Sequence, residues 1–110
     1  MADTAAYYSV STLAVKPENQ AKVVEFFTKV AEATEKAEQA AQIYRWYKVE
    51  GKDEFVWIEK FASEKDYRAH QQSSHVQGLY KEYLQYITEP FVFFPVDTSE
   101  DQLVGGFERA

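Results

Sequence analysis

The chain has no cysteine, little glycine or proline, and no long apolar run. Without cysteine, disulfides, thiolate metal sites and cysteine nucleophiles are excluded. The four glycines, Gly51, Gly78, Gly105 and Gly106, form no Gly-rich phosphate loop, so no nucleotide cofactor is expected. No stretch approaches the roughly 20 apolar residues of a membrane span. The first six residues lack the basic and apolar regions of a signal peptide. We therefore expect a soluble, cytoplasmic protein.

Basic residues are also scarce, and the formal net charge is −6. The 12 lysines and arginines are scattered rather than clustered. Binding to nucleic acid or to an anionic membrane surface is therefore not expected, because both need a basic patch. Hydrophobic residues make up 45% and aromatic residues 16% of the chain, which is typical of one folded domain and excludes disorder. Aromatic side chains fill cores and also line pockets for flat ligands, so the composition does not choose between these roles.

Hydrophobic periodicity and turn residues predict seven elements in the order β-α-β-β-α-α-β. They are a strand over 6–15, a helix over 18–38, strands over 42–50 and 54–62, helices beginning at Ser63 and at Ser74, and a strand over 91–96. This order is the split βαβ, ferredoxin-like pattern, an α+β fold with a four-stranded antiparallel sheet and helices on one face. Residues 1–96 are assigned to this domain. Residues 97–110 are assigned to a C-terminal arm that packs on a partner subunit.

Apolar side chains occupy both faces of the expected strands, whereas a sheet covered on one side by helices usually alternates apolar with polar residues. Ile43, Tyr47 and Val49 oppose Tyr44 and Trp46; Phe55, Trp57 and Phe61 oppose Val56 and Ile58; Phe91 and Phe93 oppose Val92 and Phe94. The helices can cover one face only. The other would leave a larger apolar patch than a soluble monomer normally exposes. We therefore predict a homodimer in which two sheets pack face to face.

Both histidines lie in one short segment, His70 and His75. On an unbroken helix a five-residue separation places them about 140° apart. Because no third ligand is evident, no metal site is expected. Two interpretations stay open. In the structural one, His75 bonds nearby backbone and His70 faces water. In the functional one, a histidine projects between helices and sheet as a hydrogen-bond donor or base.

Charged residues within the apolar strands are the remaining candidates for chemistry. Glu59 and Arg45 either pair on one face of neighbouring strands, or Glu59 orients one of the histidines. Trp57, Tyr67 and Tyr80 are core residues that also suit a pocket wall. Gly78 interrupts a helix at a cost of about 1 kcal/mol relative to alanine, which favours a close approach of backbone or ligand there.

A longer motif in the chain resembles that of a known protein family. The string Phe55-Val56-Trp57-Ile58-Glu59-Lys60-Phe61, then Ser63-Glu64, Ala69-His70 and His75, resembles the antibiotic biosynthesis monooxygenase (ABM) domain family. The resemblance implies a dimeric α/β barrel with a pocket between sheet and helices in each subunit. It also implies a cofactor-independent monooxygenase acting on a phenolic, quinol or polyketide-type aromatic molecule. The haem-degrading relatives differ, since they carry an Asn on the first strand and this chain has none.

Carried over position by position, the resemblance implies the site residues. His70, His75 and Glu59 are the catalytic candidates, Trp57, Tyr67 and Tyr80 the substrate-binding candidates, and no metal or cofactor is implied. The alternative function is a non-catalytic dimeric protein that binds an apolar small molecule in the same pocket. A third alternative is a purely structural dimer whose aromatic residues all belong to the core.

Overall fold

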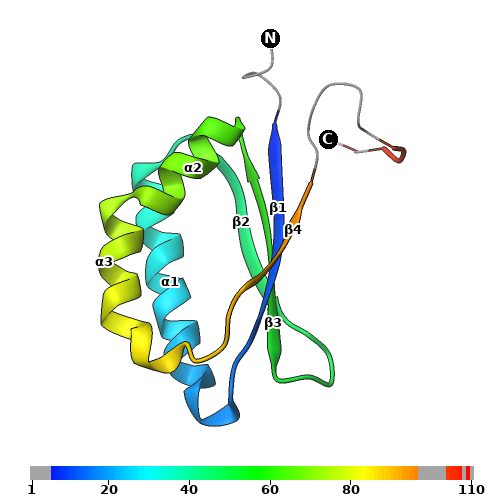
Figure 1. Ribbon diagram of the computed structural model, residues 1–110. Coiled ribbons are helices and arrows are strands. Elements are labelled where there is room, and N and C mark those ends of the chain that lie inside the picture. The colour runs from blue at the N-terminus through cyan, green and yellow to red at the C-terminus, as the bar shows by residue number, and fades with distance from the viewer. Residues whose placement is uncertain (1–5, 97–103, 108, 110) are drawn as a thin grey trace.

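A sheet and a layer of helices make up the part of the chain that the computed structural model describes, residues 6–96, 104–107 and 109 (Figure 1). The elements are β1 (Tyr7–Ala14), η2 (Pro17–Asn19), α1 (Gln20–Ala37), β2 (Ala41–Lys48), β3 (Glu54–Phe61), α2 (Glu64–Gln72), α3 (Ser74–Tyr83), η3 (Leu84–Tyr86) and β4 (Val92–Pro95). The strands pair antiparallel in the order β2-β3-β1-β4. The predicted ferredoxin-like α+β fold is confirmed.

The helix starts follow from serine side chains. Ser63 caps α2 and accepts a hydrogen bond from the backbone N–H of Asp66, as predicted. The predicted start of the next helix at Ser74 is confirmed, although the residue that caps α3 is Ser73. The Ser73 hydroxyl accepts from the backbone N–H of Val76 and donates to the backbone carbonyl of His70 at 2.7 Å. One serine therefore closes α2 and opens α3, and the chain changes direction there.

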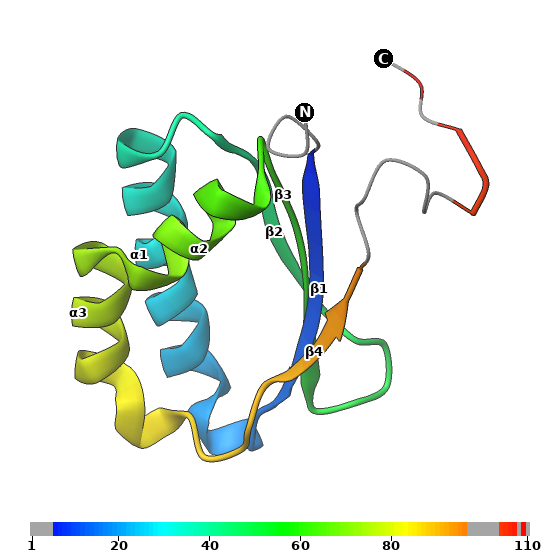
Figure 2. The same cartoon turned by 45° about the horizontal axis from the view of Figure 1, so that its top comes forward.

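All three α-helices of the described chain lie on one side of the sheet, and Figures 1 and 2 show no described element across the other side. The helix-facing side holds the buried strand residues. They are Ser9, Ser11 and Leu13 of β1 and Phe55, Trp57, Glu59 and Phe61 of β3. Leu13, Phe55 and Trp57 join Phe26, Phe27 and Val30 of α1 in the core. The helix layer therefore covers a face that is mostly, but not entirely, apolar.

The opposite side of the sheet, here called the open face, exposes large apolar side chains. The residues are Tyr8, Tyr47, Ile58, Val92 and Phe94, with exposed fractions from 38% to 51%. Strand register places them together, since Val10 is paired with both Ile58 and Phe94, and Thr12 with Val92. The described chain covers its sheet on one side only.

The register tests one sequence expectation about the strands, the pairing of Arg45 with Glu59. Tyr44 of β2 is opposite Glu59 of β3, and Arg45 is opposite Ile58. Neighbouring residues of a strand point to opposite faces, so Arg45 lies on the open face and Glu59 under the helices. The predicted pairing of Arg45 with Glu59 is wrong.

Three further predictions concern peripheral features. A methyl group added at Gly78 would meet no atom within 4 Å, so the predicted close approach of backbone at this glycine is wrong, and the approach of a ligand stays a prediction. The predicted arm falls largely outside the described residues, although Val104 and Phe107 are described and are exposed. The packing of this arm on a partner stays a prediction. Among the helices of the described residues, none has both the length and the apolar character that crossing a membrane requires.

Candidate active site

A cavity of about 240 Å³ lies between the helices and the sheet. Its wall includes five of the six predicted site residues, Trp57, Glu59, Tyr67, His70 and Tyr80. Phenylalanines from α1 and from the segment around β4 supply much of the remaining surface: Phe26, Phe27, Phe91 and Phe93. The sixth predicted residue, His75, does not belong to this wall. Of the two histidines, His70 is therefore the one that faces the cavity.

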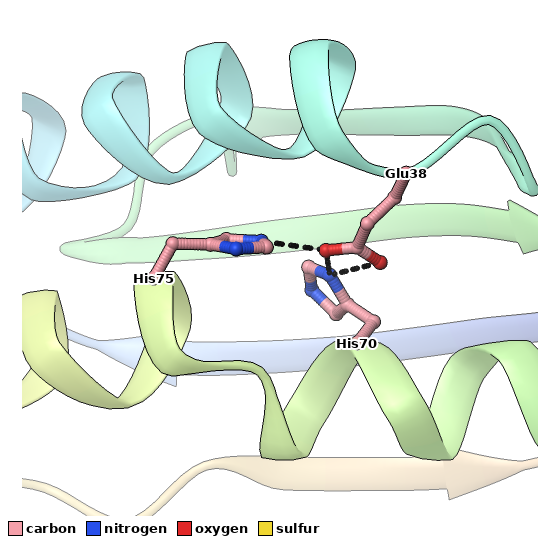
Figure 3. Close-up of side chains that lie close together, drawn as sticks. All are labelled: Glu38, His70 and His75. Carbon is pink, nitrogen blue, oxygen red and sulfur yellow. Dashed lines mark hydrogen bonds and ion pairs between the residues drawn. The ribbon is translucent and has the colours of Figure 1, made fainter.

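His70 and His75 converge on the carboxylate of Glu38, as Figure 3 shows. The Nδ1 atom of His70 lies 2.9 and 3.1 Å from the two Glu38 oxygens, and the Nε2 atom of His75 lies 2.6 Å from one of them. The His70 side chain is 6% exposed and that of Glu38 16% exposed. These three residues form one partly buried hydrogen-bonded group, here called the Glu38 triad.

The break between α2 and α3 makes this convergence possible. His70 lies in the last turn of α2, and Ser73 redirects the chain before His75 begins the first turn of α3. The angle that separates two positions on one continuous helix therefore does not apply to this pair. The expectation that His70 faces water is wrong, since it is 5% exposed. His75 contacts the side chains of Ser73 and Glu38 rather than backbone atoms.

Glu38 was not among the residues that the sequence singled out. It is the C-cap of α1, 32 positions before His70. An acidic residue is disfavoured at the C-terminal end of a helix, because the helix dipole places partial negative charge there. Two imidazole N–H groups offset that cost. An acidic residue at this unfavourable position was the one feature of the sequence that could have singled out Glu38. The expectation that Glu59 orients a histidine is wrong, because Glu38 makes that contact.

The contact with Glu38 determines what His70 can do. A carboxylate only accepts hydrogen bonds, so Nδ1 of His70 carries the proton in this contact. In a neutral ring the other nitrogen, Nε2, is then a hydrogen-bond acceptor, and the ring forms part of the cavity wall. The same carboxylate stabilises the imidazolium that forms when Nε2 takes a proton. This is the arrangement of a general base with its orienting acid.

The Glu38 triad is also the group that could hold a metal ion, since its three ligand atoms lie within 4.8 Å of one another. The expectation that a third ligand is lacking is therefore wrong. Tetrahedral zinc ligands at about 2.0–2.2 Å from the metal lie roughly 3.3 Å apart. The 2.6 and 2.9 Å contacts to one Glu38 oxygen are instead hydrogen-bond distances. The observed geometry is that of a hydrogen-bonded group, and a metal would have to separate these side chains.

Glu59 occupies the sheet side of the cavity and is 7% exposed. Burial raises the pKa of its carboxyl to about 7, and the negative charge of Glu38 contributes to the increase. Among the described residues, no hydrogen bond or ion pair satisfies this carboxyl. A carboxyl in this setting carries its proton near neutral pH and is able to donate it.

Three further side chains complete the polar wall. The Tyr67 hydroxyl accepts hydrogen bonds from Ser9 at 3.3 Å and from Gln71 at 3.0 Å, and burial raises its pKa. Burial also raises the pKa of Tyr44, an effect that the nearby Trp57 indole partly opposes. That proximity falls short of hydrogen-bond geometry, and among the described residues the buried Nε1 of Trp57 has no partner. The catalytic and binding roles of these residues stay predictions.

Comparisons with known proteins agree with the geometry. Residues 6–82 match the family described as antibiotic biosynthesis monooxygenase. A candidate antibiotic biosynthesis monooxygenase from Caulobacter crescentus has a similar structure, with a TM-score of 0.80 at 17% identity, covering 88% of this chain and 92% of that chain. One from Nitrosomonas europaea gives a TM-score of 0.72 at 18% identity, covering 86% and 92%. A conserved protein from Methanosarcina mazei gives 0.70 at 18% identity, covering 84% and 93%. No curated protein matches the sequence.

Proposed function

Because the chain belongs to the antibiotic biosynthesis monooxygenase family, we propose that it is a cofactor-independent monooxygenase acting on a phenolic, quinol or polyketide-type aromatic molecule. The observation that carries the proposal is the position of His70. One ring nitrogen is held by Glu38, and the ring forms part of the wall of a largely apolar cavity that is partly open to solvent. That arrangement suits a base that removes a proton from a phenol.

The cavity limits the size of the aromatic substrate. An apolar cavity of about 150 Å³ holds a benzene molecule. The present cavity of about 240 Å³ therefore suits roughly two fused rings. A larger polyketide would have to extend beyond it. Phe26, Phe27 and Phe91 supply apolar surface for such rings and exclude water from the reacting atoms.

The chemistry then follows from the deprotonated substrate. His70 takes the phenolic proton at Nε2, and the Glu38 carboxylate stabilises the resulting imidazolium. The electron-rich phenolate reduces dioxygen directly: one oxygen atom replaces the hydrogens of a ring C–H and O–H to give a quinone, and the other leaves as water. The protein supplies a base and a site that excludes water, and the substrate supplies the electrons. His75 contacts Oε2 of Glu38 through its Nε2 atom, the same oxygen that His70 contacts, and thereby helps to fix the orientation of the carboxylate.

Oxygen consumption by chelator-treated protein with a panel of hydroquinones tests this proposal. His70→Ala should lower the rate by about 100-fold or more, because it removes the base. Glu38→Gln should lower it by roughly 10- to 100-fold, because it removes the orienting charge. Glu50→Gln, in the exposed turn between β2 and β3, is a matched control and should leave the rate unchanged.

The same assay decides between enzyme and binding protein. Binding of hydroquinones without oxygen consumption would overturn the oxygenase and favour a non-catalytic protein that holds apolar molecules. Activity that appears only when a divalent metal is added would contradict a cofactor-free mechanism. In that case the Glu38 triad becomes the first place to look for the metal.

The functional unit in this proposal is a homodimer. The open face carries Tyr47, Ile58, Val92 and Phe94 at about half exposure, and a second copy of the same face covers them without another protein. Face-to-face sheets pack about 10 Å apart, which brings these side chains into contact across a twofold axis. Burial of both open faces would also stiffen the sheet that forms one wall of the cavity.

A further inference from the structure

We infer that Glu59 is the acid partner of His70, and that the cavity catalyses keto–enol proton transfer on an enolisable aromatic ketone without oxygen. The inference rests on the proposed function in one respect, the assignment of His70 as the base. It goes beyond that function because it adds a second proton-transferring group, a substrate class with a carbonyl oxygen, and a reaction that needs no oxidant.

The first observation is the isolation of Glu59. Glu59 is 7% exposed and lies in the cavity wall. The groups that face it are Tyr44 from β2, Tyr67 and His70 from α2, and Glu38 from the end of α1. No lysine or arginine belongs to the described cavity wall. A buried carboxyl without a cation or hydrogen bond favours its protonated form, and that proton lacks only an acceptor, which a ligand oxygen would provide.

The second observation is the placement of the two groups. Glu59 comes from β3, on the sheet side of the cavity, and His70 comes from α2, on the helix side. The His70 ring packs beside Tyr44 and Phe61, the neighbours of Glu59 on the sheet, with ring centroids 5.6 and 5.1 Å apart. An acid and a base that line the same cavity are what proton transfer between the carbon and oxygen of one substrate requires.

The third observation is a further donor beside Glu59. Trp57 lies two positions earlier on β3, so its side chain is on the same face of the sheet and also lines the cavity. Its buried Nε1–H has no hydrogen-bond partner among the described residues. Because this nitrogen is itself closed to solvent, the indole must turn before a carbonyl oxygen that accepts from Glu59 can accept from it as well. Such a pair of donors stabilises the negative charge that develops on an enolate oxygen.

The reaction balances without a co-reactant. Nε2 of His70 takes the proton from the carbon next to the carbonyl, and the electrons of that C–H bond form the carbon–carbon double bond. The carbonyl π electrons move to oxygen, which takes the proton of Glu59. The products are the enol, a Glu59 carboxylate and a His70 imidazolium. The reverse steps return a proton to carbon and regenerate both groups.

Anaerobic hydrogen–deuterium exchange tests the inference. The intact protein is incubated with 2-tetralone, a two-ring aromatic ketone, in deuterated buffer near neutral pH under argon, and the α-proton signals are followed by NMR. The wild-type protein should exchange these protons faster than buffer alone. Glu59→Gln should lose at least about tenfold of the acceleration and His70→Ala about 100-fold, in line with general acid–base effects. Glu50→Gln is the matched carboxyl-to-amide control and should exchange like wild type.

Two results would overturn the inference: wild-type protein that exchanges no faster than buffer, or Glu59→Gln and Glu59→Ala variants that both exchange as fast as wild type. A pH series adds a readout that a purely structural role would not change. The wild-type rate should decline as pH rises through the Glu59 pKa of about 7, and Glu59→Gln should lose that decline.

Failure of this inference and failure of the proposed oxygenase give different results. Oxygen consumption with hydroquinones but no anaerobic exchange overturns the acid role of Glu59 and leaves the oxygenase in place. Anaerobic exchange without oxygen consumption supports the acid–base pair and overturns the oxygenase.

Discussion

Each of the two faces of the sheet departs from the usual rule in its own way. The face under the helices contains Ser9, Ser11 and Glu59, all at most 7% exposed. The open face, which no described element covers, carries Ile58 and Phe94 at 44% and 50% exposure. Polar groups are thus buried and large apolar groups exposed. Both departures are consistent with the proposals made above, a ligand beside the first face and a second subunit on the second.

The difference also separates the energetic roles of neighbouring residues. Along β3, Trp57 and Glu59 face the helices, whereas Ile58 between them faces outward. Adjacent residues of this strand therefore lie in different environments. Trp57 and Glu59 belong to the core and the cavity wall, and Ile58 belongs to the surface that the proposed dimer would bury. Mutations can be chosen to disturb one face and leave the other intact.

The largest effect is expected for Trp57→Ala. Trp57 is 2% exposed and packs on Phe27, with ring centroids 4.5 Å apart, so its removal should cost about 3–5 kcal/mol of stability. Ile58→Ala, one position along, should cost much less in the isolated chain because Ile58 is 44% exposed. Urea unfolding at one fixed protein concentration measures both. Similar losses for the two variants would contradict the assignment of faces.

The second largest effect is expected for Glu59, where a substitution should raise rather than lower the stability of the folded protein. Burial raises the pKa of this carboxyl from 4.5 to about 7, so the folded state binds a proton that the unfolded state has lost between these values. Stability is therefore unaffected below pH 4.5 and falls as pH rises toward 7. Above pH 7 the loss reaches up to about 3 kcal/mol.

Glu59→Gln removes this titration. The variant should be more stable than wild type at pH 8, by up to about 3 kcal/mol, and nearly equal to it at pH 4. Thermal unfolding across the pH range gives the comparison, with Glu50→Gln as the exposed control. A variant that is less stable than wild type at pH 8 would show that the carboxylate is satisfied in the folded protein. A gain in stability with a loss of activity is the expected behaviour of a functional residue.

The third effect concerns dimerisation through the open face of the sheet. Phe94→Ser should weaken dimerisation, since burying the exposed half of this side chain contributes about 1 kcal/mol per subunit, or about 30-fold in the dissociation constant of the dimer. Leu84→Ser is the matched control, because Leu84 is 51% exposed but lies in η3 on the helix layer. Analytical ultracentrifugation measures both. A wild-type chain that stays monomeric at micromolar concentration would exclude the dimer.

The sequence predicts those features of the two faces that depend on residues close together in the chain, and it misses those that depend on distant residues. Hydrophobic period and turn residues are local, and they predicted the element order and the double-sided strands. The motif around Trp57 and Glu59 and the position of His70 also led to residues that line the cavity. Glu38 was missed because its contact with His70 joins the end of one helix to another, and no local pattern specifies such a contact.

The misassigned pairing of Arg45 and Glu59 has a related cause. Which residues of two strands are neighbours depends on register, and a shift of one residue moves a side chain to the other face. Here the β2–β3 register is irregular between Ala41 and Ile43, and Tyr44 rather than Arg45 comes to lie beside Glu59. The composition of each strand was therefore predictable, but the partner of a given charge was not.

The smallest effect is expected at a position that belongs to neither face. Gly78 is exposed within α3, and a methyl group there would meet no atom within 4 Å. Gly78→Ala should therefore stabilise the protein by up to about 1 kcal/mol through helix propensity and reduced freedom of the unfolded chain. Oxygen consumption and dimer dissociation should stay at wild-type values. A loss of either, in a variant that folds normally, would mean that a ligand or a second subunit approaches the α3 backbone closely, and the glycine would then be functional rather than merely tolerated.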